Sequence, residues 1–323
     1  NNINMKKRTP INSFKDGDVI QGFFLCTEKY LRHSRNGNIY LDLKLRDVTG
    51  QINAKIWKNI PALDDKFKSG DAVAISGSVE SFMNQNQLII NKINKATVQY
   101  YGRYGFDPEM IVPSSKKNPQ KMWKELTILI NSIKNKDLRE LVNYIYRLNK
   151  KKLMVLPSSL KMHYSFRSGF LEHVLNIAKV AKKIGPLYNV DVDLLLTGVL
   201  IHDIGKLNGI SSKYVPSYTK EGTLLGHVVI GRDMVKAAIE RNKKFPKELS
   251  VKLEHIILSH RGQYEWKSPK LPAFPEALLV HMIDMLDSRM SLMGITLDED
   301  LQPGDFTNQF NSFGIPLFKK DGT

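Results

Sequence analysis

The spacing of apolar residues changes once along this chain, and that change constrains the fold more than any other feature. From Asp18 to about Ala96, apolar and polar residues alternate in short stretches separated by turn residues, as they do in β-strands. Beyond Trp123, apolar residues recur every three or four positions over long stretches, which is typical of amphipathic helices. Because one segment cannot satisfy both periods, the sequence predicts a β domain followed by a separate helical domain.

The first domain shows its two faces most clearly in two neighbouring strands. Leucines alternate with polar or aromatic residues in 38–46, and after a Thr-Gly turn the alternation continues through 51–57. A short helical stretch at 63–68 precedes two further strands, at 71–82 and 88–93. Five strands with a helix after the third predict an all-β OB-fold barrel, a fold that often binds oligonucleotides.

Aromatic and cationic side chains share the polar face of the second and third strands. Aromatic rings stack with bases and cations neutralise phosphates, so this combination suits single strands without requiring one sequence. We therefore predict a surface that binds single-stranded nucleic acid. Its residues are Tyr40, Lys44, Arg46, Lys55 and Trp57. The alternative is that Tyr40 and Trp57 only cover the barrel edge or pack against the second domain.

The formal net charge of +16 is distributed unevenly along the chain. Residues 1–160 carry 27 Lys and Arg against 14 Asp and Glu, whereas residues 161–323 carry 21 against 18. Since nucleic acids attract clustered positive charge, the excess indicates that the first half contacts nucleic acid. The alternative is that the additional lysines serve only solubility.

Residues 97–120 are rich in Tyr, Gly, Pro and Ser and predict a linker. We expect a disordered or cloning-derived tail, a β domain, a linker, a helical domain and a C-terminal tail, at 1–12, 13–98, 99–120, 121–300 and 301–323. The polar, basic residues 1–10 lead us to expect no secretory signal. The sequence contains no apolar run of membrane-spanning length, and the single Cys26 excludes an internal disulfide. We expect a cytoplasmic protein without a membrane partner, and its oligomeric state stays open.

Histidines are concentrated in the helical half, where six of the eight lie between His173 and His281. A single buried histidine is most often a hydrogen-bonded core residue, but one on each of several helices beside carboxylates indicates a metal centre. Asp203 follows the apolar run 194–201, where an unpaired carboxylate is costly to bury and a bound cation would remove that cost. Without cysteine ligands, this set favours an open catalytic site over a closed structural zinc site.

Four motifs in residues 160–295 resemble those of the HD-domain metal-dependent phosphohydrolases. They are Leu171-Glu172-His173, His202-Asp203-Ile204-Gly205-Lys206, Gly226-His227 and Ile283-Asp284. The resemblance implies an all-α helical bundle in which Asp203 bridges two divalent ions. It assigns to the first ion the ligands His173, His202, Asp203 and Asp284.

The resemblance assigns the second ion to His227 and to the segment Ser259-His260-Arg261-Gly262, which often reads His-His in this superfamily. Arg261 stands where the second histidine is expected, so this ion has one ligand fewer. His255, five residues before His260 in the same predicted helix, is the alternative ligand.

Phosphoryl chemistry gives the remaining candidates their roles. Two ions about 3.5 to 4 Å apart can bind the attacking and leaving oxygens of an in-line displacement and lower the pKa of a bridging water. Lys206 would then bind a phosphate oxygen, and Arg261 or Arg167 would assist. His163 is predicted to line the substrate cleft. The alternatives are solvated side chains for the three cations and a structural role for His163.

Two further residues lie near Asp284 in the same predicted helix. His281 and Asp287 are each three residues from Asp284 and therefore share its helix face. His281 is predicted to orient the Asp284 carboxylate from outside the ligand set. Asp287 either does the same or pairs with a nearby cation.

The order of the domains, together with segment 257–266, resembles the YhaM-type 3′-5′ exoribonucleases over nearly the whole chain. The resemblance implies stepwise removal of nucleoside monophosphates from the 3′ end of single-stranded RNA, and also of single-stranded DNA. It further implies one or two divalent ions, with manganese favoured. Two alternatives remain open, namely a phosphohydrolase of free or cyclic nucleotides and a strand-binding protein whose helical domain is only a scaffold.

Overall fold

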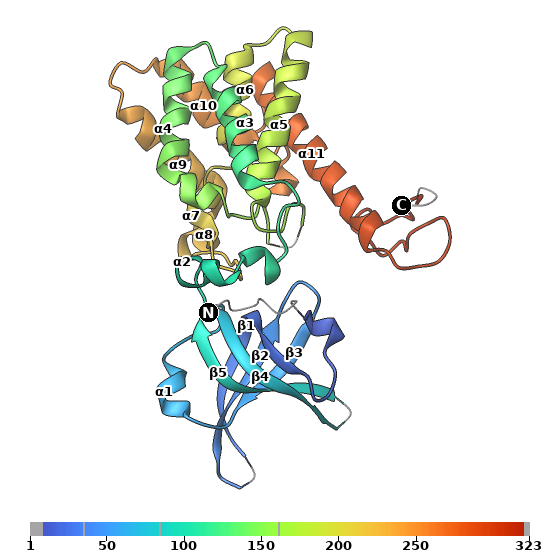
Figure 1. The fold of residues 1–323 in the computed structure, drawn as a ribbon. Coiled ribbons are helices and arrows are strands. Elements are labelled where there is room, and N and C mark those ends of the chain that lie inside the picture. The colour runs from blue at the N-terminus through green and yellow to red at the C-terminus, as the bar shows by residue number, and fades with distance from the viewer. Residues whose placement is uncertain (1–8, 35, 84, 161, 320–323) are drawn as a thin grey trace. The chain divides into compact units, whose positions relative to one another are not determined.

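The computed structural model describes residues 9–34, 36–83, 85–160 and 162–319. The chain divides into two compact units, of which unit 1 comprises 1–114 with 213–215 and unit 2 comprises 115–212 with 216–323. Unit 1 is built from strands and unit 2 from helices (Figure 1). The predicted order of an all-β barrel followed by an all-α bundle is confirmed.

Unit 1, in its described residues, forms a closed barrel of five strands (Figure 1). They are β1 (Val19–His33), β2 (Ile39–Arg46), β3 (Gln51–Ile56), β4 (Ala72–Phe82) and β5 (Gln85–Lys95). Their order around the barrel is β1-β2-β3-β5-β4, with β3 and β5 parallel and the other pairs antiparallel. Helix α1 (Ile60–Asp64) follows β3, a few residues earlier than predicted.

The register of β2 and β3 decides which side chains enter the barrel. Leu43 pairs with Ala54, and both are buried, whereas Asp42 pairs with Lys55 on the outer face. Along β3, and along β2 after its first residue, every second residue is an apolar one and is buried in the same way. The predicted strand-binding residues are therefore carried on a face whose reverse side is fixed by the core.

The barrel core extends beyond the limits predicted for the β domain. Ile11 is buried, and the Asp47 carboxylate accepts a hydrogen bond from the Ile11 backbone N–H. At the other end, Phe106 and Ile111, from the segment predicted as a linker, are buried in a small cluster that belongs to unit 1. Of the tail predicted at 1–12, residues 1–8 lie outside the described residues.

Cys26 is fully buried in the barrel core. Burial raises the pKa of its thiol to about 12, and only the thiolate reacts with thiol reagents. We expect the native protein to resist Ellman's reagent at about pH 8, and urea-unfolded protein to release one equivalent of chromophore per chain. Rapid labelling of the native protein would contradict this position for Cys26.

Unit 2 is a bundle of helices, as the helical period beyond Trp123 predicted (Figure 1). Its long helices are α3 (Pro119–Asn131), α4 (Lys136–Leu153), α5 (Gly169–Ile184), α6 (Val192–Ile201), α9 (Gly226–Glu240), α10 (Lys247–Ser259) and α11 (Pro275–Glu299). Short helices α7 (Lys206–Gly209) and α8 (Lys220–Leu224) lie between α6 and α9, and α2 (Val98–Tyr101) belongs to unit 1. Within the described ranges, no helix is long and apolar enough to cross a membrane.

Helix α6 is the central helix of this bundle. Its residues 194–201 are all buried, and it packs against α4, α5, α10 and α11. The Asp191 carboxylate caps its first turn by accepting hydrogen bonds from the Asp193 and Leu194 backbone N–H groups. Since α6 is enclosed by other helices, its C-terminal end delivers the next residues, His202 and Asp203, into the interior.

Candidate active site and strand-binding surface

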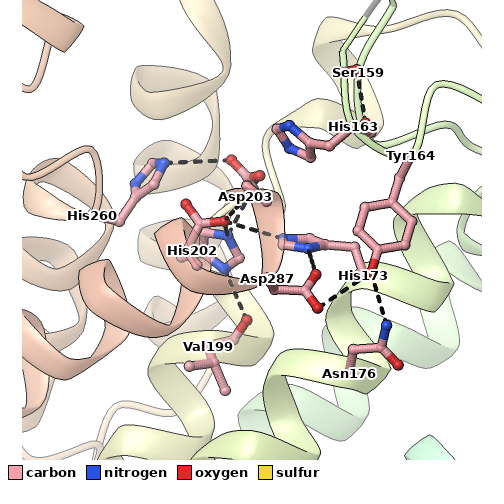
Figure 2. A network of polar contacts seen from close by, with 12 residues as sticks. Ser159, His163, Tyr164, His173, Asn176, Val199, His202, Asp203, His260 and Asp287 are labelled. Carbon is pink, nitrogen blue, oxygen red and sulfur yellow. Dashed lines mark hydrogen bonds and ion pairs between the residues drawn. The ribbon is translucent and has the colours of Figure 1, made fainter. Parts of the chain in front are cut away.

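Histidine and aspartate side chains from several helices of unit 2 converge on one buried cluster (Figure 2). His202 follows the last residue of α6 and His260 follows the last residue of α10. His173 lies in α5, and Asp203 directly follows His202. Helix α9 adds His227 near its start, and α11 adds Asp284.

The Asp203 carboxylate lies between two groups of candidate ligand atoms. The first group is His173, His202 and Asp203, and the second is Asp203, His227 and His260. Asp203 Oδ2 lies 3.4 Å from His202 Nε2, whereas Asp203 Oδ1 lies 3.2 Å from His227 Nε2 and 3.4 Å from His260 Nε2. Asp203 therefore contributes one oxygen toward each group.

Asp284 extends the first group. Its Oδ1 lies 3.3 Å from His173 Nε2 and 3.7 Å from His202 Nε2. Ligand atoms about 2.1 Å from one ion stand about 3.0 to 3.4 Å apart in tetrahedral or octahedral geometry. The separation from His173 lies within this range, and that from His202 exceeds it by about 0.3 Å.

The hydrogen bonds of the rings test whether such an ion fits. Nδ1 of His202 donates to the Val199 carbonyl oxygen at 2.8 Å, and Nδ1 of His260 donates to the Ile257 carbonyl oxygen at 2.7 Å. Nε2 is thus the nitrogen that faces the cluster. Within the cluster, five buried atoms of the described residues have no hydrogen-bond partner. They are Nε2 of His173, His202, His227 and His260, and Oδ1 of Asp203. Unpaired buried polar atoms are costly, so this set fits a divalent cation.

Opposite charges stabilise the cluster without an ion. Burial lowers the pKa of His202, but the carboxylates of Asp203 and Asp284 outweigh that effect and raise it to about 10. Burial raises the pKa of Asp203, but Lys206 and His202 hold it well below its ordinary value. The Lys206 ammonium is in direct contact with the Asp203 carboxylate. An incoming metal ion therefore has to displace a proton from His202.

We expect metal binding to release at least one proton at neutral pH. Only the neutral imidazole coordinates an ion, and His202 is protonated below about pH 10, so metal affinity falls as pH falls and rises toward about pH 10. Calorimetric titration with Mn²⁺ in two buffers of different ionisation enthalpy measures this release. Identical apparent enthalpies in both buffers would contradict it.

A cavity of about 290 Å³ adjoins the cluster. Lys206 and His227 line it from the cluster, and Arg261 and Tyr218 also contribute to its wall. His163 lines it as predicted, and burial lowers the pKa of this histidine to about 4, so the ring is neutral at pH 7. The cavity thus combines two cations with a neutral hydrogen-bonding ring.

The predicted aromatic residues of unit 1 lie together. Tyr40 and Trp57 stack with ring centroids 4.6 Å apart and an interplanar angle of 25°. Lys55 Nζ lies 5.6 and 5.9 Å from these two centroids, and 5.4 Å from that of Phe82, which the sequence analysis missed. Trp57 is 41% exposed and Phe82 is 53% exposed. We call Tyr40, Lys55, Trp57 and Phe82 the aromatic platform.

The other two predicted cations of unit 1 are less available. Lys44 Nζ lies 3.4 Å from a carboxylate oxygen of Glu28. Arg46 is half-buried, and its Nε is buried without a hydrogen-bond partner among the described residues. The exposed surface of this face is therefore provided mainly by the rings and Lys55.

Comparison with known proteins finds a family model in each of the two units. A model of the HD domain matches residues 170–289, and a model of the OB-fold nucleic acid binding domain matches residues 27–96. The 3′-5′ exoribonuclease YhaM of Halalkalibacterium halodurans is 31% identical over 309 residues, which cover 95% of this chain and 94% of that protein. YhaM of Bacillus subtilis is 32% identical over 310 residues, which cover 94% of this chain and 97% of that protein.

The chain belongs to the YhaM family of 3′-5′ exoribonucleases. The resemblance drawn from the motifs is thereby confirmed, and with it the enzyme class of a metal-dependent hydrolase. The HD match spans His173 to Asp284, and the OB match spans Tyr40 to Phe82. The buried cluster and the aromatic platform thus lie within the two matched domains.

In the His-His segment typical of HD domains, this chain has Arg261 in place of the second histidine, and the structure does not bring His255 into the cluster instead. His255 Nε2 accepts a hydrogen bond from the Ala273 backbone N–H at 3.1 Å, and its ring packs against Phe274. Arg261 is exposed, and its Nε donates to the Trp266 carbonyl oxygen at 3.3 Å. The second ligand group therefore consists of Asp203, His227 and His260 within the described residues.

Two other residues have contacts that differ from those predicted. His281 does not orient Asp284, because its Nδ1 donates to the His260 carbonyl oxygen at 2.8 Å. Asp287 contacts His173 and not a cation, with Oδ2 2.8 Å from Nδ1. The role of Arg167 stays a prediction; this residue lies in the turn before α5, where its carbonyl oxygen accepts a hydrogen bond from the Ser115 backbone N–H.

Proposed function

We propose that this protein degrades single-stranded RNA stepwise from the 3′ end, accepts single-stranded DNA as a second substrate, and releases nucleoside 5′-monophosphates. The observation that carries the proposal is the convergence of four imidazole Nε2 atoms and the Asp203 carboxylate in one buried cluster beside a cavity. The names of its relatives, 3′-5′ exoribonucleases, support the direction of degradation.

We assign the ligands in two sets that share Asp203. His173, His202, Asp203 and Asp284 would hold the first ion, and Asp203, His227 and His260 the second. Ions in such a set polarise a phosphoryl oxygen and supply hydroxide from water at neutral pH. Nitrogen and oxygen ligands without thiolates suit manganese, iron, cobalt or zinc, and we propose manganese as the working ion.

Two cations and one histidine give the cavity its proposed roles toward the substrate. Lys206 lies at the boundary of cluster and cavity, where its ammonium would neutralise charge that develops on the scissile phosphate. Arg261, which lines the cavity, would provide a second cation, with Arg167 as a further candidate. His163, neutral at pH 7, would hydrogen-bond the terminal nucleotide.

The cavity size supports removal of one nucleotide at a time. Ligand pockets commonly measure about 300 to 1,000 Å³, and this cavity, at about 290 Å³, lies at the lower end of that range. A space of this size suits one nucleotide and not a longer segment. In this proposal the aromatic platform holds the strand through base stacking, independently of its sequence.

The test uses one RNA strand labelled at either end, with and without Mn²⁺. A ladder from the 5′-labelled strand and immediate release of a labelled 5′-mononucleotide from the 3′-labelled strand are the expected results. Intact RNA with rapid turnover of free or cyclic nucleotides would instead indicate a nucleotide phosphohydrolase. Tight strand binding without hydrolysis would indicate a binding protein.

A further inference from the structure

The His173 ring is held from its outer side by a polar network to which the proposed function assigns no role (Figure 2). Asp287, from α11, lies with Oδ2 2.8 Å from His173 Nδ1. Its Oδ1 accepts a hydrogen bond from the Tyr164 hydroxyl at 3.2 Å, and the hydroxyl in turn accepts one from Asn176 Nδ2 at 2.8 Å. Asn176 lies three residues after His173 in α5, so the network starts and ends on the same helix.

The position of His173 within its helix explains why it needs an acceptor from outside. His202 and His260 follow the last residues of α6 and α10, where the carbonyl groups of the final turn are free to accept from Nδ1. His173 is the fifth residue of α5, where the nearby carbonyl groups accept the helical hydrogen bonds. Asp287 is thus the partner of His173 Nδ1, as the carbonyl oxygens of Val199 and Ile257 are the partners of Nδ1 in His202 and His260.

Helix α11 contacts both nitrogens of this ring. Asp284 Oδ1 lies 3.3 Å from Nε2, and Asp287 Oδ2 lies 2.8 Å from Nδ1. The two aspartates are three residues apart and so lie on one face of the helix. The same helix therefore carries a ligand beside the inner nitrogen and a carboxylate that fixes the outer one.

The burial and backbone conformation of Tyr164 fix its position in this network. It is buried, and its backbone has φ +50°, a left-handed conformation that non-glycine residues rarely adopt. Gly169 permits this turn, because a Cβ there would lie 2.2 Å from the Tyr164 carbonyl oxygen. That oxygen also accepts a hydrogen bond from the Ser158 backbone N–H at 3.0 Å. Unusual backbone conformations of this kind persist where the surroundings fix them, often at functional sites.

We propose that Asp287 is a positioning residue that orients His173 so that Nε2 faces the metal ion, and that Tyr164 and Asn176 hold Asp287 in place. The inference rests on the proposed function, in which His173 is a ligand. A carboxylate on the outer nitrogen fixes the ring and its tautomer and strengthens Nε2 as a ligand, and loss of such a partner typically weakens metal affinity about 10- to 100-fold.

The experiment measures the Mn²⁺ dissociation constant of the full-length protein by calorimetry. Asp287→Ala is expected to raise this constant about 10- to 100-fold, whereas Asp287→Asn, which keeps an acceptor oxygen, should raise it less. Tyr164→Phe should also give a smaller increase, because it removes one of the hydrogen bonds to Asp287. The visible absorption spectrum of the Co²⁺-loaded protein should change in Asp287→Ala, since it reports the ligand geometry.

Glu172→Ala is the matched control. Glu172 precedes His173 in α5, and its carboxylate has the same 13% exposure as that of Asp287. It accepts a hydrogen bond from the Ser115 hydroxyl at 2.6 Å and pairs with Lys117 at 3.0 Å. Its removal takes away a partly buried carboxylate at the same helix, and the Mn²⁺ dissociation constant should stay unchanged.

Two results would overturn the inference. One is a wild-type dissociation constant in Asp287→Ala, and the other is an equal loss in Glu172→Ala, which would indicate general destabilisation. If Asp287→Ala does not fold, Asp287→Leu, closer in volume, decides by the same criteria. A wild-type protein that binds no Mn²⁺ would overturn the proposed function itself, so the two failures are distinguishable.

Discussion

Replacement of Asp203 by alanine is expected to lower kcat on a 5′-labelled single-stranded RNA by at least about 10³-fold. The reason is that the Asp203 carboxylate faces both ligand groups, with Oδ2 toward His202 and Oδ1 toward His227 and His260. Single-turnover rates with saturating Mn²⁺ measure the effect, because they separate hydrolysis from product release.

The control for this prediction is Asp233→Ala, which removes an exposed aspartate of the same unit. It should hydrolyse RNA at the wild-type rate. Strand affinity of Asp203→Ala should also match the wild type, since the aromatic platform belongs to unit 1. An Asp203→Ala variant that retains a tenth of the wild-type kcat would contradict the assignment.

Replacement of Trp57 by alanine is expected to weaken binding of single-stranded RNA by about 1 to 3 kcal/mol, or about 5- to 150-fold in Kd. Trp57 provides an exposed ring that is already stacked on Tyr40 and capped by Lys55, so a base can stack without reorganising the platform. Fluorescence anisotropy with a labelled oligonucleotide measures the change. Hydrolysis of a small chromogenic phosphodiester, which needs no platform, should stay intact.

Tyr100→Ala is the control for a lost aromatic side chain. Tyr100 is 66% exposed and belongs to the same unit, but it lies in α2 and outside the platform. Its loss should leave strand affinity unchanged. Equal loss of strand binding and phosphodiester hydrolysis in Trp57→Ala would indicate misfolding and would count against the platform.

The hydrophobic period was sufficient to predict a β-barrel followed by a helical bundle. The continuous apolar run at 194–201 already indicated an enclosed helix, and the structure buries all of it. Segment 97–114 was predicted less well, because its Gly and Pro content resembles that of a linker while Phe106 and Ile111 pack into unit 1. Gly and Pro content indicates turns, but it does not show which apolar residues between the turns are buried.

Helix geometry explains why His260 lies in the cluster and His255 does not. Five residues correspond to a rotation of about 140° around an α-helix, so the two rings cannot share a face. His260 faces Asp203, whereas His255 faces Phe274. The sequence suggested His255 as a substitute ligand because the two are close along the chain, but the helical rotation separates them.

Tyr164 could not be found from the sequence. It lies in an irregular turn, where no periodicity relates it to Asp287 more than a hundred residues later, and the φ of +50° is a property of the packed structure. Asp287 was partly predictable, because its spacing from Asp284 placed it on the correct helix face. Its partner, His173 instead of a cation, depends on how α5 and α11 pack.

The excess of basic residues is concentrated in the first half of the sequence, but it is not concentrated in unit 1. Unit 1 contains 17 Lys and Arg against 11 Asp and Glu, whereas unit 2 contains 31 against 21. Much of the basic excess of residues 1–160 therefore lies on α3 and α4 and their surroundings, in the helical unit. Charge alone did not identify the strand-binding unit, and the stacked rings of the platform carry that proposal.

The most direct test of the account is a titration of metal-depleted protein with Mn²⁺ in which bound ions and hydrolysis are measured in the same samples. Electron paramagnetic resonance counts the bound ions, and a 5′-labelled RNA reports the rate. We expect the rate to rise with occupancy, to saturate when the two groups that share Asp203 are filled, and to be absent in Asp203→Ala. Full hydrolysis by the metal-depleted protein, or a rate independent of bound Mn²⁺, would contradict the account.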